Sequence, residues 1–241
     1  MAFAQSHHKI REDLHFFEIK GRKIPLIVRR NPRARRMILR LNVVGEGAVV
    51  TIPAGASSAD AFDLVRRKSS WLDQQLKKIG ARIYFGDGVC IPFRGLQYIV
   101  RHRDDVYGTV WIENGEINVT GDVEYLDCRL GDWLKKQAHI NIVPLVYKKA
   151  KQINKTVSRI TIRDTRTRWG SCSAKGGLSF SWRLIMAPPE ILDYVVAHEV
   201  SHLAYMNHSP RFWGTVDMLT EHAKNGRLWL RDNGSILHRI G

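Results

Sequence analysis

The amino-acid sequence predicts an α+β protein in which a β-rich N-terminal region precedes a mostly helical domain. Short runs of alternating apolar and polar residues, separated by turn residues, fill most of the chain up to about residue 120. Helical periodicity begins after Gly121-Asp122, so we place the boundary there, with a β-rich region and one helix over residues 1–121 and a second domain over residues 122–241. One nearly all-apolar helix of the second domain carries two histidines and a glutamate.

The N-terminal region is expected to contain two sets of short strands and one helix. Ser57 or Ser58 is the expected N-cap of the helix, which extends to about Ile79. Asn114-Gly115 predicts a tight hairpin, because both residues tolerate positive φ. The expected strands are residues 24–28, 37–43 and 48–52, with Gly45-Glu46-Gly47 as the turn between the last two, and then residues 89–93, 97–102, 109–112 and 116–119.

The second domain opens with a long helical pattern over residues 125–154. Pro144 lies within it and lacks a backbone N–H, so we expect a kink there or two helices that meet. Residues 158–163 and 178–182 are predicted strands, and residues 165–170 lead into a turn-rich passage between them.

The predicted strand at residues 178–182 has one apolar and one polar face. If it forms a sheet edge, an extended substrate could pair with it by β-augmentation, and the alternative is an ordinary core strand. A helix is expected from Pro188-Pro189-Glu190 to about Met206-Asn207, followed by short closing helices over residues 210–224 and 227–232.

The composition indicates a globular protein with a large excess of basic residues. Lys and Arg number 38 against 23 Asp and Glu, which gives a formal net charge of +15 and predicts attraction to polyanions. Between Lys9 and Arg40 there are eleven basic residues and three acidic ones. This cluster makes a nucleic-acid-associated protein the second functional hypothesis, and the alternative is that the arginines lie on exposed strand faces for solubility.

The number and spacing of the cysteines and the length of the apolar segments indicate the cellular compartment of the protein. The three cysteines, Cys90, Cys128 and Cys172, are far apart and odd in number, so we predict neither a disulfide framework nor a cysteine zinc site. The first residues contain no apolar core of signal-peptide length, and ionisable residues interrupt the most apolar stretch. We therefore expect a cytoplasmic protein with no membrane partner, and we leave its oligomeric state open.

Residues 198–208, HEVSHLAYMNH, carry the chemistry of the chain. On an α-helix His198 and His202 project from the same face, one turn apart, and can bind one metal ion. Glu199 is displaced around the helix, so its carboxylate would lie beside a metal-activated water and act as a general base. This is the HExxH arrangement, and it is favoured over a pair of core histidines because burying these groups without a metal or partners would be costly.

A catalytic zinc site usually has three protein ligands, and His208 is the preferred third ligand. Ser209-Pro210 predicts the start of a new helix, which would place His208 at a tight corner beside the other two histidines. Glu221, 19 residues after His202, is the rival, and His222 is a weaker one. We prefer His208 because a tight corner requires fewer assumptions.

These residues predict peptide-bond hydrolysis of a protein or peptide substrate. A zinc ion (Zn2+) held by the three histidines would lower the pKa of its water towards about 7 and polarise a carbonyl, and Glu199 would pass the proton to the leaving amine. An inactive metal-binding module is a further alternative. The donor that stabilises the oxyanion stays open among Arg166, Arg168, Tyr194, Tyr205, Arg211 and His222.

Several short segments, spread over most of the chain, together form a recognisable pattern. In the second domain they are residues 168–173 (RWGSCS), Trp182-Arg183-Leu184 with Pro188, the HEVSH segment, residues 207–209 and Phe212-Trp213. In the N-terminal region they are residues 33–36, 50–53 and Trp71-Leu72. This pattern resembles the YgjP-like metallopeptidase family, which is related to the SprT-like zinc peptidases. The resemblance implies a zincin-like catalytic domain behind a smaller β-rich region, with His198, His202 and His208 as metal ligands and Glu199 as base. SprT-like relatives process DNA-bound proteins, so the resemblance also makes peptidase activity compatible with nucleic-acid association. Tyr205 stands where one large zincin group has a turn glycine, so that turn geometry is not carried over.

Overall fold

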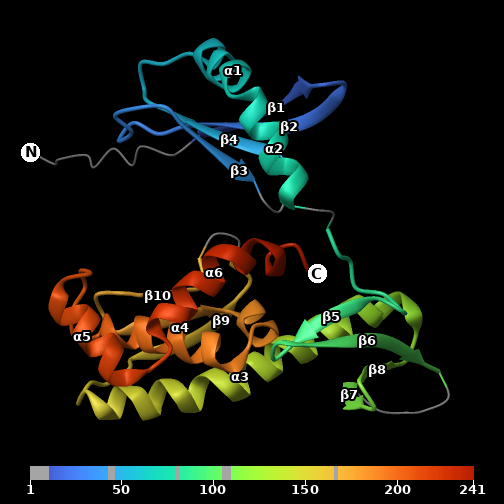
Figure 1. Cartoon of the computed structure of the whole chain (residues 1–241), viewed down its shortest axis with the longest axis vertical. Helices are drawn as coiled ribbons and strands as arrows, with labels where there is room; N and C mark the ends of the chain where they lie inside the picture. Colours follow the sequence, from blue (N-terminus) through green and yellow to red (C-terminus); the bar gives the residue numbers. More distant parts are fainter. Residues whose placement is uncertain (1–10, 43–46, 80–81, 105–109, 166–167) are drawn as a thin grey trace, which may run out of the picture. The chain divides into compact units, whose positions relative to one another are not determined.

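The computed structural model of the chain describes residues 11–42, 47–79, 82–104, 110–165 and 168–241, and it confirms the predicted α+β class. The chain forms two compact units that divide between Ala81 and Arg82, each shown in Figure 1. We predicted a boundary near residue 121 instead. The difference arises because the second set of strands shares one hydrophobic core with the C-terminal helices.

The first unit is a four-stranded sheet with two helices. The strand order is β1-β2-β4-β3, in which β2 and β4 are parallel and the other pairs are antiparallel. Ser57 caps the first helix in a capping box with Asp60, as predicted, but the helix is divided at Lys68 into two. The elements are β1 (Arg11–Ile19), β2 (Arg22–Arg30), β3 (Ile38–Asn42), β4 (Gly47–Ile52), α1 (Ser58–Arg67) and α2 (Ser69–Ile79).

Three of these strands match the predicted ones, and β1 was not predicted as a separate strand. Its burial alternates along the strand: Leu14 and Phe16 are exposed, whereas Phe17 and Ile19 on the other face pack on the core of the unit. The predicted turn at residues 45–47 lies mostly outside the described residues. The core of this unit contains Leu26, Val50, Ile52, Val65 and Leu72.

The described residues of the second unit form two sheets and four α-helices. The first sheet has the order β5-β6-β8-β7, and its Asn114-Gly115 hairpin is confirmed, with φ of 51° and 78° at these two residues. The second sheet has the order β10-β11-β9. The elements are β5 (Cys90–Phe93), β6 (Leu96–Arg103), β7 (Val110–Glu113), β8 (Glu116–Thr120), η1 (Val123–Tyr125), α3 (Leu126–Gln152), β9 (Arg159–Arg163), β10 (Gly170–Cys172), β11 (Gly177–Ser181), η2 (Trp182–Met186), α4 (Pro189–Ser201), α5 (Pro210–Leu219) and α6 (Ala223–Leu237).

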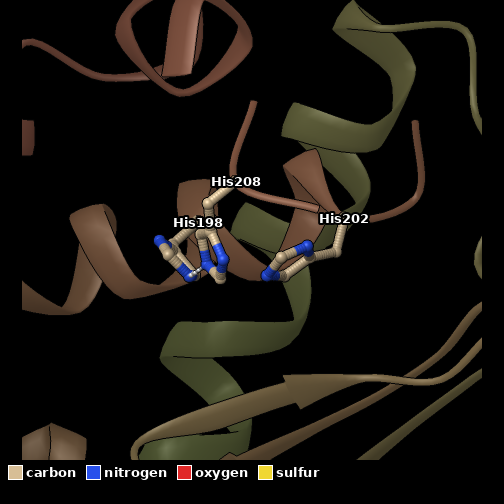
Figure 2. A group of neighbouring side chains, drawn as sticks. All are labelled: His198, His202 and His208. Atoms are coloured by element: carbon tan, nitrogen blue, oxygen red, sulfur yellow. Dashed lines mark hydrogen bonds between the residues drawn. The ribbon is translucent and has the colours of Figure 1, made fainter. Parts of the chain in front are cut away.

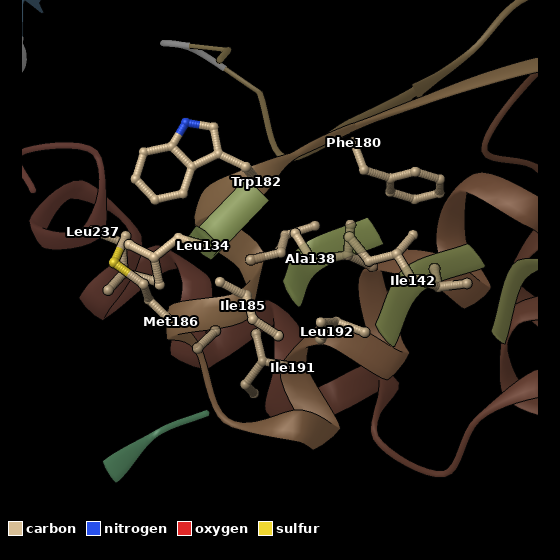
Figure 3. Close-up of a cluster of buried hydrophobic side chains, with 14 of the residues drawn as sticks. Leu134, Ala138, Ile142, Phe180, Trp182, Ile185, Met186, Ile191, Leu192 and Leu237 are labelled. Atoms are coloured by element: carbon tan, nitrogen blue, oxygen red, sulfur yellow. The ribbon is translucent and has the colours of Figure 1, made fainter. Parts of the chain in front are cut away.

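The long helix α3 carries the main core of the second unit. It is a single helix of 27 residues that continues through Pro144, rather than two helices, and Pro144 lies on its exposed side. Its buried side chains recur every four residues and pack against η2 and α4 (Figure 3). None of the described helices combines the length and apolar character needed to cross a bilayer. The buried stripe of α3 is Leu126, Leu130, Leu134, Ala138, Ile142 and Val146.

The strand predicted at residues 178–182 is β11, which pairs with β10 on one side and β9 on the other, so of the two alternatives it is the core strand and not the sheet edge. Other predictions in this unit need correction. The passage predicted to be rich in turns supplies the edge strand β10. The helix predicted to reach Met206-Asn207 ends at Ser201, and α6 is longer than the predicted helix over residues 227–232.

A buried ion pair connects α3 to α4. Lys149 Nζ lies 2.7 Å from Asp193 Oδ1 and also donates to the carbonyl of Leu219, at 2.6 Å, at the end of α5. Thr220 Oγ1 donates to the second carboxylate oxygen of Asp193 at 2.6 Å. Because both charges have hydrogen-bond partners, this network fixes α4 against α3 and α5.

We expect Lys149→Met to destabilise the protein by about 3 kcal/mol, because it leaves a partly buried carboxylate without its cation. Lys148→Met, at the exposed neighbouring position on α3, is the matched control and should change stability by less than about 0.5 kcal/mol. Urea unfolding followed by tryptophan fluorescence measures both. Equal stability of the two variants would contradict a structural role for the pair.

Candidate metal centre

Helix α4 places the first two histidines. Pro189 occupies its first position, and the helix is buried along almost its whole length. His198 lies in the last turn, and His202 is the C-cap with helical backbone angles of −65° and −18°, so the two side chains keep their one-turn spacing although the helix ends early. Their ring centroids are 5.1 Å apart.

His208 joins these two residues at the corner before α5. Ser209 caps α5 by accepting from the Phe212 backbone N–H at 3.4 Å, and Pro210 is the first helical residue, as predicted. This turn brings His208 Nε2 to 3.2 Å from His198 Nε2. Figure 2 shows the three imidazoles pointing toward one another.

The three histidines could hold a metal ion together. One ring nitrogen from each lies within 4.8 Å of the others, and within the described parts of the chain no other group of three or more His, Cys, Asp or Glu side chains is close enough to do so. The rival third ligand, Glu221, has an 88% exposed side chain and lies 3.7 Å from the ring of His222. The structure therefore brings His208 to the pair and leaves Glu221 and His222 away from it.

An aromatic pair from α5 supports the cluster. The Phe212 ring is fully buried, and its centroid lies 5.0 Å from that of His198, 4.5 Å from that of His202 and 4.8 Å from that of His208. Trp213 contacts the rings of His198 and His208, both at 5.8 Å. The sequence analysis did not predict that these two rings support the histidines. The feature of the sequence that could have indicated it is the aromatic pair four and five residues after His208.

The electrostatics of the cluster favour neutral imidazoles, which is the form that binds metal. Burial, with smaller effects from His202, His208 and Arg227, lowers the pKa of His198 to about 4. Burial also lowers the pKa of His202. The hydrogen bond that its Nδ1–H donates to the Tyr205 carbonyl, at 3.0 Å, has the opposite, smaller effect on this pKa. That bond leaves Nε2 of His202 as the free electron-pair donor.

The donor set fits a metal ion. Three imidazoles whose ring nitrogens converge are a favourable site for a divalent transition metal. The Nε2 atoms of His198 and His208 face each other at 3.2 Å, and burial keeps His198 and His202 in the neutral form that binds metal.

Glu199 lies beside the triad and points toward β10. It is 7% exposed, and burial raises its pKa to about 7 against the opposing effect of Arg168. A Cβ atom at residue 170 would lie 2.7 Å from Glu199 Oε1, so only glycine fits there. Sequence reasoning placed Gly170 in a turn and did not predict this contact.

The predicted oxyanion donors are dispersed. Tyr194 is buried and packs between the His198 ring, 6.0 Å away, and Gly226, where a Cβ would overlap the tyrosine ring. Tyr205 contributes its backbone carbonyl to the site. Arg168 is exposed near Glu199, Arg211 is exposed on α5, His222 lies by Glu221, and Arg166 lies outside the described residues.

A triad of histidines beside a buried carboxylate defines a metalloenzyme type of site. Residues 35–233 match the model of the YgjP-like metallopeptidase domain, so the chain belongs to the YgjP-like metallopeptidase family, as its motifs predicted. The match covers more than half of the chain and includes the whole histidine cluster. No curated protein and no solved structure matches the chain. A metallopeptidase requires a metal cofactor, and the triad could bind it.

We expect Gly170→Ala to lower peptidase activity by about 10²-fold, because the added methyl group displaces the Glu199 carboxylate while the histidines stay in place. Gly214→Ala is the control, since this glycine lies inside α5 with no atom near its Cβ direction. That control should keep full activity and gain about 0.5–1 kcal/mol of stability. Cleavage rate and metal content measure both, and full activity of Gly170→Ala would contradict the contact.

Proposed function

We propose that the chain is a zinc-dependent peptidase that hydrolyses peptide bonds with Glu199 as general base. The observation that carries this proposal is the convergence of three imidazoles, with the pKa of His198 and His202 lowered by burial, together with the neighbouring buried carboxylate of Glu199, whose pKa is raised. Three protein ligands with one remaining position are typical of catalytic zinc, which supports zinc over other metals.

In this proposal each residue has one role. His198, His202 and His208 hold the ion, and the Tyr205 carbonyl orients His202. When bound, zinc polarises the scissile carbonyl and lowers the pKa of water to about 7. Glu199 takes the proton from the attacking water and delivers it to the leaving amine, and a carboxylate whose pKa is near 7 is suited to both steps.

The substrate backbone has a site of attachment next to Glu199. In the described chain, β10 pairs with β11 on one side and has no strand on the other, so an extended peptide could pair with its second edge. Gly170 at the start of β10 contacts the Glu199 side chain. An extended peptide paired with β10 would pass the Glu199 side chain, which is the proposed base. We therefore propose β10, and not β11, as the strand with which the substrate pairs.

The proposal includes a reducing, cytoplasmic location. All three cysteines, at positions 90, 128 and 172, are free thiols. Burial, with a smaller effect from the nearby Glu199, raises the pKa of Cys172 to about 11, which favours the protonated thiol, a poor metal ligand.

Glu199→Gln should keep its zinc and lose at least about 10²-fold in the rate of peptide cleavage, because the amide cannot accept the proton. The matched control is Glu190→Gln, which changes an exposed glutamate in the first turn of the same helix and should leave the rate unchanged. The measurements are zinc content by elemental analysis and cleavage of an unfolded protein substrate.

Two outcomes would contradict this proposal. Equal cleavage by Glu199→Gln and by the unchanged protein would remove the role of Glu199. A zinc-loaded chain that cleaves no peptide bond in any of a broad set of unfolded proteins would be an inactive metal-binding module.

A further inference from the structure

A polar groove of about 620 Å³ follows the exposed face of the sheet β10-β11-β9. The opposite face of this sheet carries apolar side chains, with Leu178 and Phe180 buried in the core. The roles proposed for the three histidines and Glu199 do not explain why the other face of this sheet is polar. The groove is lined by Arg159, Thr161, Arg163, Thr165, Arg168, Ser171, Cys172, Ser173, Gly177, Leu178 and Ser179.

The strand register arranges these residues in rows. Ser171 is paired with Ser179 and Ser179 with Thr161, so three hydroxyl-bearing residues lie side by side across the sheet. Arg159 and Arg163 are two residues before and after Thr161 on the same strand and therefore on the same face. Thr161, at the β9 end of the hydroxyl row, therefore lies between two arginine positions on the same face of β9.

The groove has positive charge without a counter-charge. Its lining contains three arginines and no aspartate or glutamate. Of the salt bridges found within the described residues, none includes Arg159, Arg163 or Arg168; the neighbouring Asp164 is paired with Arg183 instead. The side chains of Arg159, Arg163 and Arg168 are exposed, so they are available to a ligand.

One end of the groove lies at the proposed catalytic base. Ser171 and Arg168 flank Gly170 in sequence, and Gly170 packs directly against the Glu199 side chain. Arg168 also acts electrostatically on Glu199. A peptide bond held at Glu199 would therefore have neighbouring substrate residues over the arginine-lined face.

We propose that this groove binds acidic side chains of the substrate, so that the enzyme selects peptide segments rich in aspartate and glutamate. This inference rests on the proposed peptidase function and names the substrate class of the same site. Guanidinium groups bind carboxylates through paired hydrogen bonds, and the hydroxyls of Ser171 and Ser179 supply further donors, whereas Thr161 and Thr165 donate to backbone carbonyls.

A peptide fits the groove better than single-stranded nucleic acid, which would be the other polyanionic ligand. Proteins that bind single strands combine positive charge with aromatic rings on which bases stack. The lining contains no Phe, Tyr, Trp or His. Its position next to a peptidase site also favours a peptide.

The test measures binding separately from catalysis. Zinc-loaded, full-length Glu199→Gln is titrated against a fluorescent peptide of alternating glutamate and glycine and against its counterpart with glutamine at every glutamate. We expect the glutamate peptide to bind at least about tenfold more tightly, with the difference shrinking as salt is raised. Adding Arg159→Gln and Arg163→Gln should reduce the preference to less than about twofold.

The matched control is the pair Lys136→Gln and Lys148→Gln, which removes the same charge from exposed positions on α3 and should keep the preference. Equal binding of the two peptides, or a preference that survives the arginine changes, would overturn the inference. Tighter, arginine-dependent binding of an oligodeoxythymidylate than of the acidic peptide would also overturn it and assign the groove to nucleic acid. Absence of cleavage by the unchanged protein would count against the peptidase proposal alone, because the binding comparison requires no catalysis.

Discussion

The contact of Phe212 with all three imidazole rings is the interaction on which the rest of the site depends. His198 and His202 are placed by α4, but His208 follows the helix in a separate turn and reaches them only because α5 starts at Ser209-Pro210. The fully buried Phe212 ring, at 4.5–5.0 Å from each imidazole, holds that turn against α4. Lys149 fixes the other end of α5 through the Leu219 carbonyl. The geometry of the metal site is therefore a consequence of how two helices pack.

Burial gives the carboxylate and the histidines complementary properties. The same desolvation that lowers the pKa of His198 to about 4 raises that of Glu199 to about 7, so burial favours neutral His198 and His202 and lets the glutamate exchange a proton near neutral pH. Gly170 allows this arrangement, because a side chain there would take the space of the carboxylate. The edge strand that begins at Gly170 then connects the base to the arginine-lined groove. The proposed substrate edge and one side of the groove therefore lie on a single strand of three residues, which contacts the proposed base on α4.

The sequence predicted the parts of the fold and of the site that depend on local spacing. The i, i+4 histidines, the Ser209-Pro210 helix start, the Ser57 cap and the Asn114-Gly115 hairpin depend on residues close in sequence, and the structure has all four. The division of the units was missed and the place of β11 in its sheet was left open between edge and core, because both depend on which distant segments lie together. Gly170 was missed for the same reason, since its partner Glu199 lies 29 positions later in the chain.

The metal content of the purified protein, compared with that of His208→Ala, tests the central claim most directly. We predict about one zinc per chain in the unchanged protein and a sharp loss in the variant, because a tetrahedral site that keeps only two protein ligands binds zinc weakly. His139→Ala, an exposed histidine on α3, is the control and should retain its zinc. Absence of zinc from the unchanged protein after zinc is supplied, or equal zinc in His208→Ala, would contradict the three-histidine site.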